Sequence, residues 1–172
     1  MFVACEFISQ SEVYTVMKAA VFSDTHGLTS LMLDAARSSG AEVLIHLGDH
    51  DSDADVLRRE LPDKALYVVR GNCDMCSFAP DFDVVPLGSV KAFITHGHLY
   101  NVRWGDLSNL AYAALEQGAK LALFGHTHET VYEDYGSVTV VNPGTAGKGR
   151  ELTWAEIVVN DDGGFAVNIK NL

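Results

Sequence analysis

This chain is poor in cationic side chains and cysteine, and it has no long apolar run. Lys and Arg number 12 against 23 Asp and Glu, so the net charge is −11. That balance argues against a surface that coats nucleic acid or attaches to an anionic membrane. No stretch approaches the roughly 18 apolar residues that a membrane-spanning helix needs. The three cysteines are odd in number, which argues against a disulfide framework.

The length and composition fit one globular domain. The chain has 172 residues, of which 48% are hydrophobic, enough for a sizeable core. Met17 stands one residue before the first apolar run and resembles a natural start. We therefore expect residues 17–172 to form a single domain and residues 1–16 to be an N-terminal extension without an assigned role. The first 16 residues lack a basic leader, so we expect a cytoplasmic protein.

Strand and helix patterns alternate in the first half of the chain. We predict strands over 18–23, 43–47 and 65–69, and helices over 29–38 and 53–60. Ser52 or Asp53 is expected to cap the second helix. Two successive strand–helix–strand units of this length predict a parallel sheet.

The second half changes to mostly strand patterns. One helix is predicted over 104–117, and the predicted strands are 82–86, 89–95, 121–124, 129–134, 137–141, 152–159 and 164–169. Tyr135-Gly136 and Asp162-Gly163-Gly164 are typical of hairpin turns. Parallel strands followed by antiparallel hairpins predict two sheets packed together.

Short segments rich in Asp, Asn and His begin within two residues of the end of five of the apolar runs. They are Asp24-Thr25-His26, Gly48-Asp49, Gly71-Asn72, His96-Gly97-His98 and Gly125-His126-Thr127-His128. The carboxyl ends of parallel strands open onto one edge of a sheet, so these segments are expected to converge. Carboxylates, imidazoles and one carboxamide are ligands that hold a pair of divalent metals. Gly-Asp and Gly-Asn alone are ordinary turn dipeptides, but turns do not need imidazoles, and the combination predicts a metal site.

The ordered set of segments resembles the calcineurin-like metallophosphoesterase family over residues 19–147. Asn142-Pro143-Gly144-Thr145 and the short length resemble its small prokaryotic phosphodiesterase branch, the YfcE-like proteins. The resemblance implies a four-layer α/β/β/α sandwich, an α/β fold in which helices flank two mixed sheets.

The resemblance also implies a role for each ligand-type residue. Asp24, His26 and His128 would bind one metal ion, and Asn72, His96 and His126 would bind a second. Asp49 would bridge the two ions, and a hydroxide shared by them would attack the phosphorus atom.

The mixed nitrogen and oxygen ligands suit transition metals better than Mg²⁺ or Ca²⁺. We expect two divalent ions, with Mn preferred and Ni, Fe, Co or Zn as alternatives. Two carboxylates against two divalent ions leave an excess of positive charge that attracts phosphate esters. The sequence does not identify the native metal.

Many relatives carry a histidine at the position of Cys73, and that histidine, with the following acid, is thought to protonate the leaving group. Cys73 and Asp74 are therefore candidate catalytic residues, and His98 is another because it lies two residues beyond His96. His46 is expected to be a core histidine rather than part of the site, and His50 a loop residue.

Three functions remain open from the sequence. The favoured one is a phosphodiesterase acting on a small phosphodiester or nucleotide-like substrate. The alternatives are a phosphomonoesterase and a non-catalytic scaffold of the same fold that binds other proteins. Lys148 and Arg150 are either solvated loop charges or a phosphate clamp, and formation of a homo-oligomer is left open.

Overall fold

The structure is a computed structural model that describes residues 16–172. The predicted extension therefore lies outside the described residues except for Val16. The described chain contains three α-helices, α1 (Thr29–Ser38), α2 (Ala54–Glu60) and α3 (Ser108–Glu116). Its strands are β1 (Met17–Phe22), β2 (Val43–His46), β3 (Ala65–Val68), β4 (Phe82–Leu87), β5 (Val90–Thr95), β6 (Leu121–Leu123), β7 (Thr130–Asp134), β8 (Thr139–Pro143), β9 (Thr153–Val159) and β10 (Phe165–Asn171).

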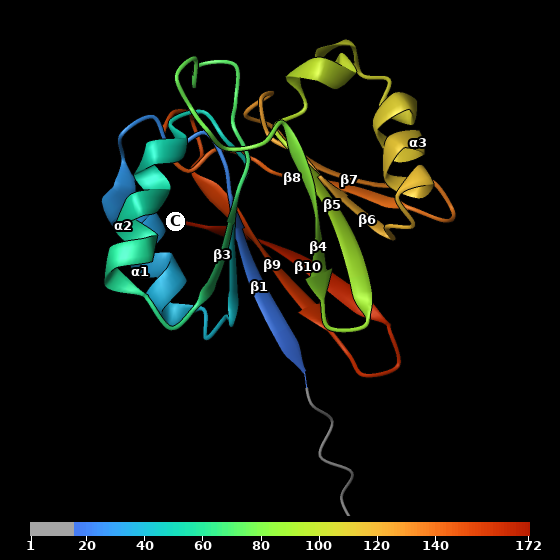
Figure 1. The fold of residues 1–172 in the computed structure, drawn as a ribbon, viewed down its shortest axis with the longest axis horizontal. Helices are drawn as coiled ribbons and strands as arrows, with labels where there is room; N and C mark the ends of the chain where they lie inside the picture. The colour runs from blue at the N-terminus through green and yellow to red at the C-terminus, as the bar shows by residue number, and fades with distance from the viewer. Residues whose placement is uncertain (1–15) are drawn as a thin grey trace, which may run out of the picture.

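The first sheet has the strand order β10-β9-β1-β2-β3. Strands β1, β2 and β3 are parallel, as the two strand–helix–strand units predicted, and β9 pairs antiparallel with β1. The predicted hairpin at Asp162-Gly163-Gly164 joins β9 to β10. The sheet is therefore mixed, with its parallel part on the side covered by α1 and α2 (Figure 1).

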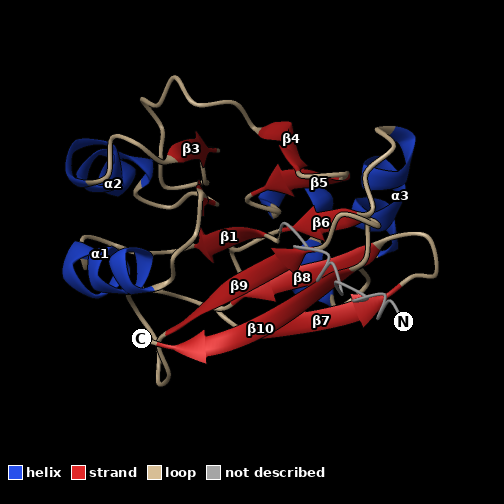
Figure 2. Cartoon of the chain, turned by 90° about the horizontal axis from the view of Figure 1, so that it is seen from below, coloured by secondary structure: helices blue, strands red, loops and turns tan. Residues whose placement is uncertain are grey.

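The second sheet has the order β4-β5-β6-β8-β7. Strands β5, β6 and β8 are parallel, whereas β4 and β7 form antiparallel edges. The predicted turn at Tyr135-Gly136 lies between β7 and β8. Helix α3 packs on the outer face of this sheet, so the two sheets lie between two helical layers (Figure 2).

The alternation of side chains along β1 explains how the layers hold together. Ala19 and Val21 belong to the apolar cluster between the sheets, while Ala20 and Phe22 belong to the cluster under α1 and α2. All four are buried, because a strand with sheet neighbours and a layer on each face presents no side chain to water. The four-layer α/β/β/α sandwich is confirmed.

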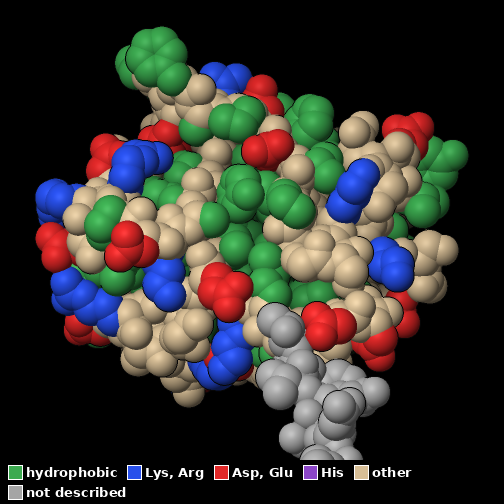
Figure 3. Space-filling view, turned by 60° about the horizontal axis from the view of Figure 1, so that its bottom comes forward, with side chains coloured by type: hydrophobic (Ala, Val, Ile, Leu, Met, Phe, Trp, Pro, Cys, Tyr) green, Lys and Arg blue, Asp and Glu red, His purple; other side chains and the backbone are tan. Residues whose placement is uncertain are grey.

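The face opposite the carboxyl ends of the central strands has an apolar centre. Hydrophobic side chains form a band across its middle, with Lys, Arg, Asp and Glu side chains around it (Figure 3). Among the described residues, no helix is both long and apolar enough to cross a membrane.

Two predicted boundaries were wrong. The helix predicted over 104–117 begins at Ser108, because residues 102–104 form a separate 3-10 turn and Gly105 has a φ of +78°, which a helix cannot continue through. The strand predicted over 137–141 runs from Thr139 to Pro143 instead. The backbone N–H of Tyr135 donates to the carbonyl of Val138, so residues 137 and 138 belong to the hairpin turn and not to the strand.

The predicted cap of α2 is confirmed in its position but not in its hydrogen bond. The N-cap residue is Asp53, but its side chain makes no cap hydrogen bond. Its carboxylate instead accepts from the Thr25 hydroxyl at 2.7 Å and from the Gly27 N–H at 2.7 Å. Asp53 therefore fastens the start of α2 to the turn that contains Asp24 and His26.

Candidate metal centre

Strands β1, β2, β5 and β6 end at the upper edge of the molecule in Figure 1, where the polar segments that follow them meet. Several of these residues have a left-handed backbone, which costs free energy in residues other than glycine. The described chain has seven such residues. Five of them are predicted metal ligands: Asp24 (φ +55°), His26 (+44°), Asp49 (+56°), His126 (+70°) and His128 (+62°). Backbone strain is thus concentrated where the sequence predicted function.

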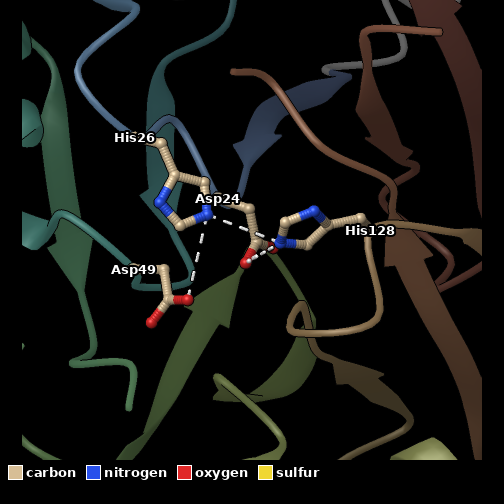
Figure 4. A group of neighbouring side chains, drawn as sticks. All are labelled: Asp24, His26, Asp49 and His128. Atoms are coloured by element: carbon tan, nitrogen blue, oxygen red, sulfur yellow. Dashed lines mark hydrogen bonds and ion pairs between the residues drawn. The ribbon is translucent and has the colours of Figure 1, made fainter. Parts of the chain in front are cut away.

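Four of the predicted ligands form a compact cluster (Figure 4). One ligand atom from each of Asp24, His26, Asp49 and His128 lies within 4.8 Å of the other three. The Nε2 atom of His128 lies 3.2 Å from Asp24 Oδ1 and 3.5 Å from His26 Nε2. The Nε2 atom of His26 lies 4.0 Å from Asp49 Oδ2. These atoms come from three segments of the chain, the first and last more than 100 residues apart, and they point to one place.

A second group lies on the other side of Asp49. The Nε2 atom of His96 is 3.4 Å from Asp49 Oδ1, and His126 Nδ1 is 3.2 Å from His96 Nε2. Asp49 thus turns one carboxylate oxygen toward His26 and the other toward His96. Asn72 is exposed, and its side-chain nitrogen lies 3.5 Å from the sulfur of Cys73.

The hydrogen bonds of this cluster fit a bound cation. The Nδ1 atom of His128 faces the carbonyl of Lys148 at 3.2 Å, and Nδ1 of His96 faces the carbonyl of Leu47 at 2.8 Å. A carbonyl only accepts, so Nδ1 of each ring carries the proton and Nε2 of the neutral ring keeps a free electron pair. Asp24 Oδ1 is buried and has no hydrogen-bond partner. Two electron-pair donors facing each other at 3.2 Å fit a metal ion between them.

The electrostatics keep the cluster in the protonation state that metals require. Burial opposes ionisation of Asp49, but the Cys73 N–H, the neighbouring His96 and the Cys73 thiol together hold the pKa of the carboxyl below its usual value. Burial lowers the pKa of His26 and, with help from His96 and Arg103, lowers that of His126 to about 4. Neutral imidazoles and ionised carboxylates are the forms that bind metal.

The two candidate catalytic residues after Asn72 have structural partners. Cys73 donates its N–H to Asp49 Oδ1 at 2.9 Å and its thiol to Asp49 Oδ2 at 3.2 Å. Partial burial and this carboxylate raise the pKa of the Cys73 thiol to about 11. Asp74 accepts the N–H groups of Gly71 (2.7 Å), His50 (2.8 Å) and Asp51 (3.2 Å). Asp74 thus joins the loop after β3 to the segment that contains Asp49.

The other histidines divide as follows. His46 is fully buried, and its ring lies 3.1 Å from the Thr25 hydroxyl, so the predicted core position is confirmed. His50 is exposed in the loop after Asp49. His98 is half-buried next to His96, and its Nδ1 atom is buried without a hydrogen-bond partner. His98 therefore has a buried ring nitrogen near the cluster that is not used in a hydrogen bond.

Sequence reasoning missed the residues that hold the ligands in place. Thr25 connects His46 to Asp53, and the Thr145 hydroxyl donates to the Asp24 carbonyl at 3.0 Å. The Ser23 hydroxyl donates to Asp24 Oδ2 at 2.6 Å. Ser23 and Thr25 flank Asp24 in the sequence, which was the one available signal. The carbonyls of Leu47 and Lys148 gave no signal, because every residue has a carbonyl.

Gly71 packs so closely on Asp49 that we expect Gly71→Ala to damage the site. A Cβ atom at position 71 would overlap the backbone nitrogen and Oδ1 of Asp49. We expect a loss of about 1–3 kcal/mol in unfolding free energy, typical of overpacking, and weaker metal binding. Urea denaturation and metal titration would measure both. Gly40→Ala is the control: Gly40 has a left-handed φ of +66°, so alanine strains the backbone there, but its Cβ would meet nothing within 4 Å. Equal effects of the two substitutions on metal binding would contradict this role of Gly71.

Comparison with known proteins agrees with the geometry. Residues 17–161 match the calcineurin-like phosphoesterase superfamily domain. The chain is 36% identical over 131 residues to a probable metallophosphoesterase of Bacillus subtilis, YsnB, with 75% of each protein covered. It is 29% identical over 145 residues to a phosphodiesterase of Methanocaldococcus jannaschii, covering 74% of this chain and 83% of that protein.

Solved structures give the same result for the fold. A predicted phosphoesterase from Streptococcus pneumoniae superposes with a TM-score of 0.77 at 29% identity, over 91% of this chain and 90% of that one. Vacuolar Protein Sorting 29 from Cryptosporidium parvum superposes with a TM-score of 0.73 at 17% identity, over 91% and 98% of the two chains. The second likeness concerns the fold alone.

Proposed function

The chain belongs to the calcineurin-like phosphoesterase superfamily, and from this premise we propose that it is a phosphodiesterase dependent on two divalent metal ions. The observation that carries the proposal is the position of Asp49, whose two oxygens face His26 and His96 at 4.0 and 3.4 Å. A carboxylate between two groups of imidazoles is the arrangement needed to bridge two metals.

Each ligand-type residue then has a place. Asp24, His26 and His128 would hold one ion with one oxygen of Asp49, and His96, His126 and Asn72 would hold the other. When bound, such a metal pair supplies an activated water and positive charge for the phosphoryl oxygens. The carbonyls of Leu47 and Lys148 hold the rings of His96 and His128 with Nε2 directed at the metals. Cys73, through its two hydrogen bonds, holds the Asp49 carboxylate in its bridging orientation.

The positive charge of the metal-loaded site and the weak acidity of the Cys73 thiol both favour diesters as substrates. Two carboxylates and two divalent cations leave about two positive charges, which attract a phosphate ester. The thiol of Cys73 donates to Asp49, and a thiol is a weaker general acid than the histidine that many relatives carry at this position. A diester, with a single negative charge, is the substrate that metal-activated water attacks most readily.

A substrate panel tests the proposal. Protein reconstituted with Mn²⁺ should hydrolyse bis(p-nitrophenyl) phosphate faster than p-nitrophenyl phosphate. A preference for the monoester would favour a phosphomonoesterase. Binding of two metal ions without turnover of either ester would favour a scaffold. The fold of Vacuolar Protein Sorting 29 keeps that alternative under consideration.

We expect Cys73→His to raise rates most for diesters with poor leaving groups. A histidine close to Asp49 can donate a proton near neutral pH, and general acid catalysis is worth roughly 10²–10⁴-fold. A series of aryl diesters with different leaving-group pKa values would measure the effect in both proteins. Cys73→Ser is the control, because it keeps a donor to Asp49 without adding an acid. If wild type and Cys73→His depend equally on the leaving group, His98 becomes the candidate acid.

We also propose that residues 17–172 form a single metallophosphoesterase domain, which the family match over residues 17–161 supports. A chain that begins at Met17 should then bind metal and hydrolyse diesters as the full chain does.

A further inference from the structure

A pocket opens directly beside the candidate metal centre, between the loop that follows β5 and strand β7. Its volume is about 420 Å³, within the range of small-molecule sites. His126 and His128 form part of its wall. A phosphodiester held at the metal centre therefore has room here for one of its two organic substituents.

One side of this pocket is apolar and firmly packed. It is formed by Val102, Leu107 and Phe124, all of which are buried. Phe124 also contributes to the cluster under α3, so this wall is part of the core rather than of a surface loop. Such a wall suits the face of a ring-sized organic group.

Arg103 supplies the positive charge of the pocket. It is exposed and makes no hydrogen bond or ion pair within residues 16–172. Four of the six arginines of the described chain are paired with carboxylates: Arg37 with Glu60, Arg58 with Asp55, Arg59 with Glu60 and Arg70 with Asp81. Arg103 and Arg150 are not, and of these two Arg103 lines this pocket. The chain has a net charge of −11. In such a chain, an arginine without a carboxylate partner has all the N–H donors of its guanidinium group available for an external anion.

Two carboxylates stand elsewhere in the same wall. Glu133 accepts the Tyr135 hydroxyl at 3.0 Å, and Glu129 is exposed. Because they repel anions, a bound anion belongs on the Arg103 side. Because they accept hydrogen bonds, they suit hydroxyl or amino donors on the bound ring.

We propose that this pocket selects esters whose organic part has a ring with hydrogen-bond donors and a second anionic group, which Arg103 binds. A phosphorylated nucleoside or sugar has this chemistry. The inference rests on the proposed phosphodiesterase function, because the reacting phosphate must lie at the metal centre while the second anion reaches Arg103.

A pair of substrates isolates the second anion. Both are p-nitrophenyl esters of thymidine 5′-phosphate, one with a free 3′-hydroxyl and one with a 3′-phosphate. In each, water adds to phosphorus, the bond to the aryl oxygen breaks, and p-nitrophenol and the nucleotide are released. The reacting bond is the same, so the ratio of the two kcat/KM values measures recognition of the 3′-phosphate.

We expect the Mn²⁺-loaded wild type to prefer the 3′-phosphorylated ester by about tenfold, equivalent to about 1.4 kcal/mol, mainly through KM. Arg103→Met should bring the ratio close to one, and Arg103→Lys should restore part of it. Arg58→Met, which removes the same charge from the outer helix α2, should leave the ratio unchanged. Arg150→Met tests a neighbouring pocket that Lys148 and Arg150 line beside His128.

The outcomes separate the two proposals. A wild-type ratio near one, a ratio unchanged by Arg103→Met, or a loss confined to Arg150→Met would overturn the role of Arg103 while hydrolysis itself continues. If the loaded protein hydrolyses neither ester, the proposed function fails. Calorimetry with thymidine 3′,5′-bisphosphate and thymidine 5′-phosphate then tests the pocket alone. An affinity ratio that is the same in wild type and Arg103→Met would overturn the inference there too.

Discussion

Replacing Asp49 with alanine is expected to lower phosphodiester hydrolysis by more than about 10³-fold, at the upper end of active-site electrostatic deletions. Asp49 is the one residue whose two oxygens face both groups of imidazoles. Its loss should remove a ligand from each metal and leave the hydrogen bonds of Cys73 without an acceptor. Elemental analysis should show one ion or none per chain.

His128→Ala is the matched control for Asp49→Ala. His128 belongs to one group only, and it is more exposed than Asp49, so its loss should cost less activity and spare the other ion. Circular dichroism and thermal melting of each variant would show that the fold is intact. Two ions per chain and a near-normal rate in Asp49→Ala would refute the bridging role.

The fold was predictable because its signals are local and repeated. The continuous apolar run of β1 and the strand–helix alternation up to β3 are set by side chains that are neighbours in sequence. These patterns are reliable because a strand that is covered on both faces is apolar along its whole length. The hairpin glycines likewise indicated the antiparallel pairs β7–β8 and β9–β10.

The errors arose where distant residues or single backbone angles decide the structure. Ser52 or Asp53 was predicted to cap α2. Asp53 is the N-cap residue, but its carboxylate accepts a hydrogen bond from Thr25, 28 residues earlier, instead of one from the helix. Gly105, with a φ of +78°, prevents the predicted helix from beginning at residue 104, and α3 begins at Ser108. Neither the partner of Asp53 nor the angle of Gly105 can be read from a short window of sequence, since both depend on how the chain packs.

The residues of the candidate site could be predicted from the sequence, but the contacts that hold them in place could not. Strand-end position brought together Asp24, His26, Asp49 and His128, as the convergence of parallel strands requires. What orients their atoms is a set of main-chain carbonyls and left-handed angles. The sequence therefore indicated which chemical groups meet, whereas the structure was needed to find which atoms face one another.

Complete removal of metal is expected to abolish turnover, and Mn²⁺ is expected to restore it best. Most of the predicted ligands are neutral imidazoles, so we expect moderate affinity and release of the ions on prolonged chelation. Asp24 Oδ1, buried without a partner, would then face His128 Nε2 with no cation between them. Mn²⁺ accepts mixed nitrogen and oxygen ligands, whereas Mg²⁺ and Ca²⁺ prefer oxygen alone. These two ions should therefore restore little activity.

Thermal melting gives a readout that does not depend on turnover. A ligand that binds only the folded chain raises its stability by about 2.7 kcal/mol at a concentration 100 times its Kd, so Mn²⁺ should raise the Tm of the stripped protein. Asp24→Asn should reduce that shift. Asp34→Asn should leave it unchanged, because Asp34 is an exposed residue of α1 outside the cluster. If metal-free protein, verified by elemental analysis, cleaves bis(p-nitrophenyl) phosphate at the original rate, the metal centre is wrongly assigned. Metal-induced Tm shifts that Asp24→Asn does not alter would mean that the ions bind elsewhere.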